Sequence, residues 1–107
     1  APAPRSAALL QAGDFVLDES RHEIRRRGQP LSLTPLEYDL LAFLIRNRGA
    51  TFSREALLEK VWGYDFAGDT RTVDVHVRSL RAKIEDAPSA PVQLVTVRGV
   101  GYRLDLD

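Results

Sequence analysis

The sequence contains no cysteine among its 107 residues. It therefore has no disulfide bond, no thiolate metal site and no cysteine nucleophile, and it suits a reducing compartment. None of its apolar runs approaches the roughly 20 residues that a membrane-spanning helix needs. Nor is one charge in excess, because 15 basic and 15 acidic residues give a formal net charge of zero. This balance argues against a protein that is held to a polyanion by bulk charge alone.

Side chains that carry out catalysis are also scarce. Only two histidines are present, His22 and His76, and they fall on different predicted elements. The sequence has no HExxH motif and no phosphate-binding loop. Gly99 and Gly101 lack the third glycine and the following helix of a dinucleotide site, so they predict a turn. We expect neither an enzyme nor a bound metal or cofactor.

The most informative segment is a helix predicted over residues 70–85. Apolar residues recur along it at i, i+4, i+7 and i+11, which indicates a buried stripe: Val73, Val77, Leu80 and Ile84. At about 100° per residue, a second set points away from this stripe: Arg71, Asp74, Val75, Arg78, Ser79 and Ala82. His76 and Arg81 lie on the two flanks.

This outward face fits the major groove of DNA. Arginine bonds guanine edges or phosphates, serine and aspartate bond base edges, and Val75 is suited to contact a thymine methyl group. The same pattern also fits a solvated amphipathic helix with no ligand.

A β-hairpin is predicted over residues 92–105, directly after the basic helix. Residues 92–98 are rich in β-branched side chains, two glycines make the turn, and residues 102–105 return. Alternation places Thr96 and Arg98 on one face, with Arg98 at the tip. A long basic side chain on a narrow β-tip suits the minor groove of DNA, although an ordinary exposed arginine fits the pattern too.

A small antiparallel sheet is predicted within residues 9–33. Strand signals at 13–17, 22–26 and 31–33 alternate with turn residues. Residues 1–8, which are small and contain prolines, predict a linker remnant, and residues 9–107 predict one domain. Arg25, Arg26 and Arg27 either bind phosphate or protect an exposed sheet edge.

Two further helices are predicted, which complete a three-helix core over residues 34–85. Thr34 and Glu37 form a capping box around a proline, and Gly49 follows the end of this helix. Ser53 caps the next helix, over residues 54–62. Arg54 begins that helix and either grips a DNA phosphate or is a solvated first-turn residue.

The loop over residues 63–69 separates the second and third helices. It is longer than the tight turn of a simple helix-turn-helix. Tyr64 and Phe66 either pack inward or, together with Asp65 and Asp69, form a surface for a partner protein. Either Asp69 or Thr70 caps the third helix.

The order of elements predicts an α+β winged helix-turn-helix, with an N-terminal antiparallel sheet, three helices and a C-terminal hairpin wing. At this point the chain resembles the C-terminal effector domains of OmpR/PhoB-type two-component response regulators. The resemblance runs from about residue 13 to residue 104 and rests on four motifs in order: LTPLEYDLL at 33–41, SREALL with VWG at 53–63, RTVDVHVR with LR at 71–81, and TVRGVGYR at 96–103.

The resemblance implies sequence-specific binding of double-stranded DNA by a bacterial, cytoplasmic transcription regulator that acts in a phosphorelay. In such domains the third helix reads the major groove and the hairpin arginine enters the minor groove. The contacts implied by position come from both elements: Arg71, His76, Arg78, Arg81, Thr96 and Arg98. The position of Ser79 is often basic in the family, so this chain is expected to prefer a different sequence.

The resemblance also implies partners. The loop over residues 63–69 corresponds to the segment through which relatives touch RNA polymerase, and the leading sheet faces the receiver domain. Relatives bind tandem direct repeats as head-to-tail dimers once the receiver is phosphorylated. These residues contain no receiver sequence, so an isolated effector domain is expected. The neutral charge also permits a winged helix that mainly binds protein, against which the outward Arg71, Arg78 and Arg98 argue.

Overall fold

The computed structural model describes residues 9–63, 66 and 68–106. The predicted linker at residues 1–8 lies outside this range. Within the described residues, four strands form the first antiparallel sheet, in the order of the sequence: β1 (Leu9–Ala12), β2 (Phe15–Asp18), β3 (Glu23–Arg26) and β4 (Gln29–Pro30). A second, three-stranded sheet has the order β5-β7-β6: β5 (Thr51–Ser53), β7 (Gly101–Leu104) and β6 (Leu94–Val97).

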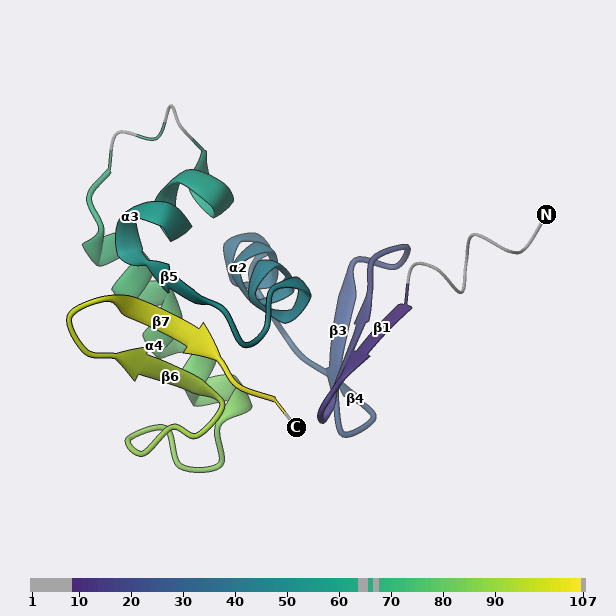
Figure 1. The fold of residues 1–107 in the computed structure, drawn as a ribbon. Helices are drawn as coiled ribbons and strands as arrows, with labels where there is room; N and C mark the ends of the chain where they lie inside the picture. Colours follow the sequence, from purple (N-terminus) through teal and green to yellow (C-terminus); the bar gives the residue numbers. More distant parts are fainter. Residues whose placement is uncertain (1–8, 64–65, 67, 107) are drawn as a thin grey trace.

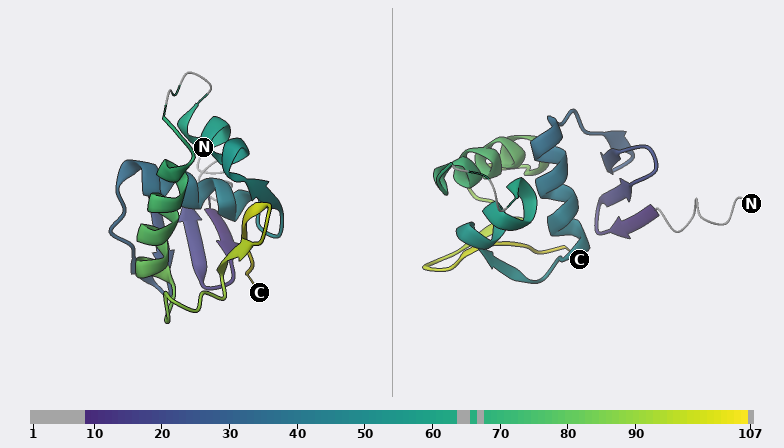
Figure 2. Two further views of the ribbon diagram at one scale, coloured as in Figure 1. Left: turned by 90° about the vertical axis from the view of Figure 1, so that its left-hand side faces the viewer. Right: turned by 90° about the horizontal axis from the view of Figure 1, so that it is seen from above.

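The helices lie between and beside these two sheets. They are α2 (Pro35–Arg46), α3 (Arg54–Leu57) with the π-helical turn η1 (Leu58–Trp62), and α4 (Arg71–Ile84). Helix α2 lies between the first sheet and the remaining elements, as the view from above shows (Figures 1 and 2). The α+β fold with a sheet, three helices and a terminal hairpin is as the sequence predicts. No helix in the described part of the chain is long and apolar enough to cross a membrane.

The first sheet differs from the prediction at two strands. The sequence patterns do not predict β1, and the strand predicted at residues 31–33 is wrong, because pairing ends at Pro30. The turn before β4 consists of Arg27 and Gly28, whose φ angles of 53° and 81° are both positive. Such a two-residue turn closes a hairpin at once, so Gln29 and Pro30 already pair with β3. The sequence predicts a turn over residues 27–30, and it does not show that the turn is two residues long, because few arginines adopt a positive φ.

The start of α2 confirms the predicted capping box. The Thr34 hydroxyl accepts the Glu37 amide at 3.3 Å, and the Glu37 carboxylate accepts the Thr34 amide at 3.0 Å. Lys83 of α4 also donates to this buried carboxylate. Burial alone would raise the pKa of Glu37, but the bonds from Lys83 and Thr34 outweigh it and lower the pKa overall. Glu37 is therefore an anion at neutral pH, and its ion pair links the two longest helices.

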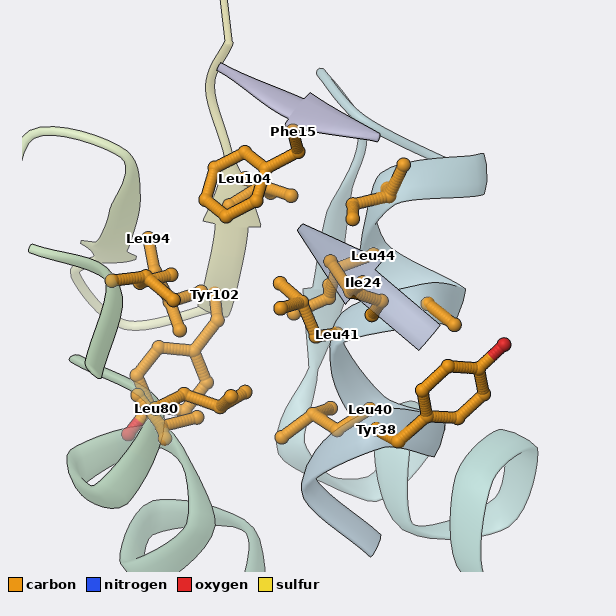
Figure 3. Packing of buried hydrophobic residues seen from close by; sticks show 14 of the residues in the cluster. Phe15, Ile24, Tyr38, Leu40, Leu41, Leu44, Leu80, Leu94, Tyr102 and Leu104 are labelled. Carbon is orange, nitrogen blue, oxygen red and sulfur yellow. The ribbon is translucent and has the colours of Figure 1, made fainter. Parts of the chain in front are cut away.

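The hydrophobic core spreads from α2 in two directions. Leu41 and Leu44 of α2 meet Phe15 and Ile24 of the first sheet, and all four are fully buried (Figure 3). On the other side, all four residues of the predicted apolar stripe of α4 are buried, including Leu80. The core therefore fixes which face of α4 points outward.

The second predicted helix begins as expected and then widens. Ser53 caps it by accepting the Ala56 amide at 3.0 Å. After Leu57 the α-helix gives way to η1, which ends at Gly63, where φ is 108°. The prediction of one helix over residues 54–62 was wrong in this respect, since its apolar pattern does not separate an α-helical from a π-helical turn.

Candidate nucleic-acid interface

The outward face of α4 presents a row of exposed side chains. Val75 is 62% exposed, and Arg78 and Ala82 are exposed as well. Steps of three and four residues place side chains above one another on a helix, so these three form one stripe. Within the described residues, no hydrogen bond or ion pair engages the Arg78 side chain. Its guanidinium is therefore available to a ligand.

Asp69, which precedes α4, holds the side chain of Arg71, the first residue of this helix. Asp69 accepts the Arg71 backbone amide at 2.7 Å and its guanidinium at 2.8 and 3.0 Å. This hydrogen bonding raises the pKa of Arg71 and lowers that of Asp69. Thr70 is the N-cap residue but makes no side-chain bond to the helix, and the carboxylate of Asp69 accepts the first helical amide in its place. The Arg71 side chain is still 86% exposed, so it stays accessible to an anion.

A second acidic residue of α4 is used inside the protein. The Asp74 carboxylate accepts the Tyr102 hydroxyl at 2.6 Å and the Arg54 Nε at 2.9 Å. Burial and the bond to Asp74 raise the pKa of Tyr102. Asp74 therefore joins α3, α4 and β7, although the sequence predicts an outward position. Arg54, which the sequence predicts as a possible phosphate contact, donates a hydrogen bond to this carboxylate from its Nε.

Arg81 and Thr96, both predicted to contact DNA, are bonded to each other. The Arg81 guanidinium donates to the Leu94 carbonyl at 2.9 Å and to the Thr96 hydroxyl at 2.8 Å. Its central carbon also lies 5.5 Å from the centre of the Tyr102 ring. Arg81 thereby fixes the hairpin to α4. The sequence identifies neither this role of Arg81 nor that of Tyr102, because their partners are distant along the chain.

His76 lies half-buried on the other flank of α4. Its Nδ1 is 2.8 Å from the Thr72 carbonyl, and its ring stands edge-on to Trp62 at 5.0 Å. A carbonyl only accepts hydrogen bonds, so Nδ1 carries a proton and Nε2 is left to face a ligand. The predicted contact by His76 is sterically restricted to its exposed edge.

Ser79 does not point as far outward as predicted. It is half-buried, and its hydroxyl contributes to the lowering of the pKa of Glu37 in the first turn of α2. A serine fits beside this buried carboxylate, where a long basic side chain would have to extend past it. A DNA contact by Ser79 stays a prediction.

The hairpin over β6 and β7 forms the predicted wing. Val97 pairs with Gly101, and the tip between them holds Arg98, which is exposed and has no bonding partner in the described part of the chain. Val100 at this tip is 53% exposed. Strand β6 begins at Leu94, two residues later than predicted.

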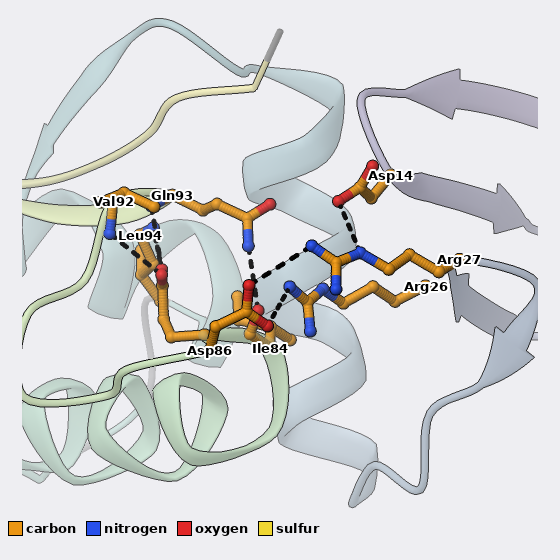
Figure 4. A network of polar contacts seen from close by, with 9 residues as sticks. Asp14, Arg26, Arg27, Ile84, Asp86, Val92, Gln93 and Leu94 are labelled. Carbon is orange, nitrogen blue, oxygen red and sulfur yellow. Dashed lines mark hydrogen bonds and ion pairs between the residues drawn. The ribbon is translucent and has the colours of Figure 1, made fainter.

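The late start of β6 has a polar cause. The buried Glu85 carboxylate accepts the amides of Val92, Gln93 and Leu94 at 2.7 to 3.0 Å (Figure 4). These amides are therefore satisfied by a side chain instead of a neighbouring strand. Glu85 connects the end of α4 to the wing, and the sequence does not identify this function.

Arg26 and Arg27 form ion pairs within the domain. The sequence leaves open whether these arginines bind phosphate or protect an exposed sheet edge. Both approach Asp86, at 3.1 and 3.4 Å, and Arg27 also bonds Asp14 at 3.1 Å (Figure 4). The hydrogen bond from Arg26 and the charges of both arginines lower the pKa of Asp86. These contacts tie the first sheet to the segment after α4, which favours a structural role.

The loop predicted to touch a partner is described only in part. Tyr64 and Asp65 lie outside the described residues. Phe66 is 39% exposed, and its ring centre is 6.4 Å from that of Trp62. A Cβ atom at Gly68 would lie 2.2 Å from the Phe66 ring, so the glycine provides the space for this ring. Phe66 is thus both packed on one side and accessible on the other.

Comparison with known proteins identifies the domain. Residues 28–104 match the family model described as "Transcriptional regulatory protein, C terminal". The chain belongs to this family. It is 50% identical to sensory transduction protein RegX3 of Mycolicibacterium smegmatis over 97 residues, which are 91% of this chain but only 42% of RegX3. The chain therefore spans less than half the length of this relative.

Two solved structures share the fold. Response regulator DrrB, a Thermotoga maritima OmpR/PhoB homolog, superposes with a TM-score of 0.82 at 33% identity, covering 92% of this chain and 44% of DrrB. The Klebsiella pneumoniae RstA DNA-binding domain in complex with the RstA box has a TM-score of 0.81 at 29% identity, covering 91% and 96%.

These comparisons confirm the central predictions from sequence. The fold is the winged helix-turn-helix of OmpR/PhoB-type response regulators, and the chain is their C-terminal DNA-binding effector domain. Its family is one of transcription regulators, not enzymes. The individual contact residues stay predictions.

Proposed function

We propose that this domain reads double-stranded DNA with α4 in the major groove and with Arg98 of the wing in the minor groove. The observation that carries the proposal is the pair of exposed arginines, Arg78 and Arg98, on two elements that Arg81 holds together. Neither arginine has an ionic partner within the described residues. Because the net charge is zero, affinity has to come from such local groups. The RstA domain, solved in complex with its box, supports DNA binding by a domain of this fold.

Replacing Arg78 with alanine is expected to weaken binding to a selected site by about 1–3 kcal/mol. It should also relax the choice of base at one position, because bidentate bonds to a base edge are lost. Dissociation constants for a panel of single-base variants, at one salt concentration, measure both effects. The matched control is Arg21→Ala, which removes a 68% exposed arginine from the turn before β3. An equal loss on every sequence would make Arg78 a phosphate contact.

Replacing Arg98 with alanine is expected to weaken binding most where the flanking DNA is A/T-rich. A/T tracts have a narrow minor groove with an enhanced negative potential, which attracts an inserted arginine. The measurement compares two DNA sites that share the same core and differ only in A/T-rich or G/C-rich flanks. If the variant lost the same factor on both, Arg98 would not read the minor groove.

Further partners belong to the same proposal. A receiver domain of the full-length protein would control head-to-tail pairing on tandem direct repeats. The greater length of RegX3 supports only the presence of further sequence beyond this domain. RNA polymerase would contact the loop around Phe66, whose ring is partly exposed beside the DNA-reading helix. A cytoplasmic location stays a prediction.

Replacing Phe66 with alanine is expected to leave DNA affinity unchanged and to reduce transcription activation several-fold. The reason is that its exposed side lies on the loop before α4, while the arginines of α4 and the wing are untouched. DNA affinity and transcription from a promoter carrying the selected site are measured in parallel. Val92→Ala, at a 75% exposed apolar residue before the wing, is the control. Loss of DNA binding would show that the loop supports α4 or contacts DNA.

A further inference from the structure

Internal bonds separate the outward residues of α4 into two groups. Asp74 is held by Arg54 and Tyr102, and Arg81 is held by the wing. Both donors bond the same oxygen of Asp74, Oδ1, and they tie this carboxylate to α3 and β7. The remaining stripe consists of Val75, Arg78 and Ala82, which have no side-chain hydrogen bonds or ion pairs within the described residues.

The spacing of this stripe matches the spacing of bases. Val75 and Ala82 are seven residues apart on an α-helix, which corresponds to about 10 Å along its axis. Three base-pair steps of about 3.4 Å cover the same length. The two ends of the stripe therefore fit two base pairs that lie three steps apart, with Arg78 between them.

The chemistry of the three side chains specifies which bases these are. Arginine forms its best bidentate bonds with O6 and N7 of guanine, and small apolar side chains contact the C5 methyl group of thymine. Val75, at 62% exposed, is the most exposed large apolar residue of α4, and nothing in the described fold covers it. A methyl group in the major groove would bury this surface.

We propose that the core of each half-site is a guanine, read by Arg78, that lies between two base pairs, three steps apart, that present a thymine methyl group to Val75 and Ala82. This inference rests on the proposed function, namely that α4 lies in the major groove. It adds the class of DNA sequence that the domain recognises. The flanking thymine can lie on either strand.

The test uses a half-site obtained by selection from random DNA. Each predicted thymine is then replaced by deoxyuridine, which removes only the methyl group. Loss of one buried methyl group is expected to raise the dissociation constant about fourfold. The Val75→Ala variant should lose the response to one of the two replacements and keep the response to the other. Val92→Ala, outside α4, should keep both responses.

The outcomes separate this inference from the proposed function. A selected core without a guanine between two thymine-bearing pairs overturns the inference. So does a core in which deoxyuridine has no effect, while Arg78→Ala and Arg98→Ala still weaken binding; the proposed function then stands. If no sequence is selected and Arg78→Ala has no effect, the proposed function itself fails. A fourfold response that Val75→Ala abolishes at one position alone supports the inference.

Discussion

The Gly101→Ala variant is expected to lose the pairing of the wing with β5 and most of the specific DNA binding. A Cβ atom at this position would lie 1.9 Å from the Phe52 carbonyl oxygen and 2.8 Å from the Ser53 Cα. Both neighbours are backbone atoms of β5, the strand that pairs with β7. They cannot move without breaking that pairing. Overpacking of this kind costs about 1–3 kcal/mol and occasionally more.

Urea unfolding measures the stability of the Gly101→Ala protein, and titration with the selected DNA measures its affinity. Val100→Ala is the matched control. It changes the neighbouring residue, which is 53% exposed at the wing tip, and it removes atoms instead of adding them. This control should unfold within about 0.5 kcal/mol of the unmodified domain. A Gly101→Ala protein as stable as the control would contradict the close approach of β5 and β7.

The Leu80→Ala variant is expected to destabilise the fold by about 2–5 kcal/mol. Leu80 is fully buried on the inner face of α4, where it packs in the core that α2 and the wing share (Figure 3). Truncation removes apolar contacts and leaves a cavity behind the DNA-reading helix. Because domains of this size have a total stability of only about 5–15 kcal/mol, the loss is a large share of it.

Val75→Ala on the same helix is the control for Leu80→Ala. Val75 is mostly exposed, so its truncation should change the free energy of unfolding by less than about 0.5 kcal/mol. Urea unfolding at one temperature compares the two proteins. Equal stability of the two variants would mean that α4 does not pack on the face that the core residues indicate.

The elements that we propose to contact DNA could be predicted because their signals are local. The apolar stripe of α4 repeats at the helical period, and the capping box of Thr34 and Glu37 spans only four residues. The wing follows from β-branched residues beside two glycines. Each of these signals depends on neighbours along the chain, so a single sequence reveals them.

The roles of Asp74, Arg81 and Tyr102 could not be predicted in the same way. Asp74 bonds Tyr102 across 28 residues, and Arg81 bonds Thr96 across 15. Helical periodicity places Asp74 on the outward face and Arg81 on a flank, but only the folded wing shows that their polar groups are already bonded. Sequence reasoning therefore overestimated how many outward residues of α4 are available to DNA.

The length of the turn at Arg27 and the π-helical form of η1 were not predicted, although a turn and a helix were. Arg27 adopts a positive φ, which arginine seldom does. The turn is therefore short, and β4 begins at Gln29, earlier than the strand predicted at residues 31–33. In η1 the backbone leaves the α-helical pattern while the composition stays that of an ordinary helix.

Selection of bound sequences from a random DNA library at low salt, with the unmodified domain and with Arg78→Ala in parallel, tests the central claim most directly. For the unmodified domain we expect a recurrent direct repeat with half-sites about one helical turn apart, and for Arg78→Ala a relaxed preference at one position in each half-site. Salt-sensitive binding without any enriched sequence, or no binding, would contradict a sequence-reading function for α4 and the wing.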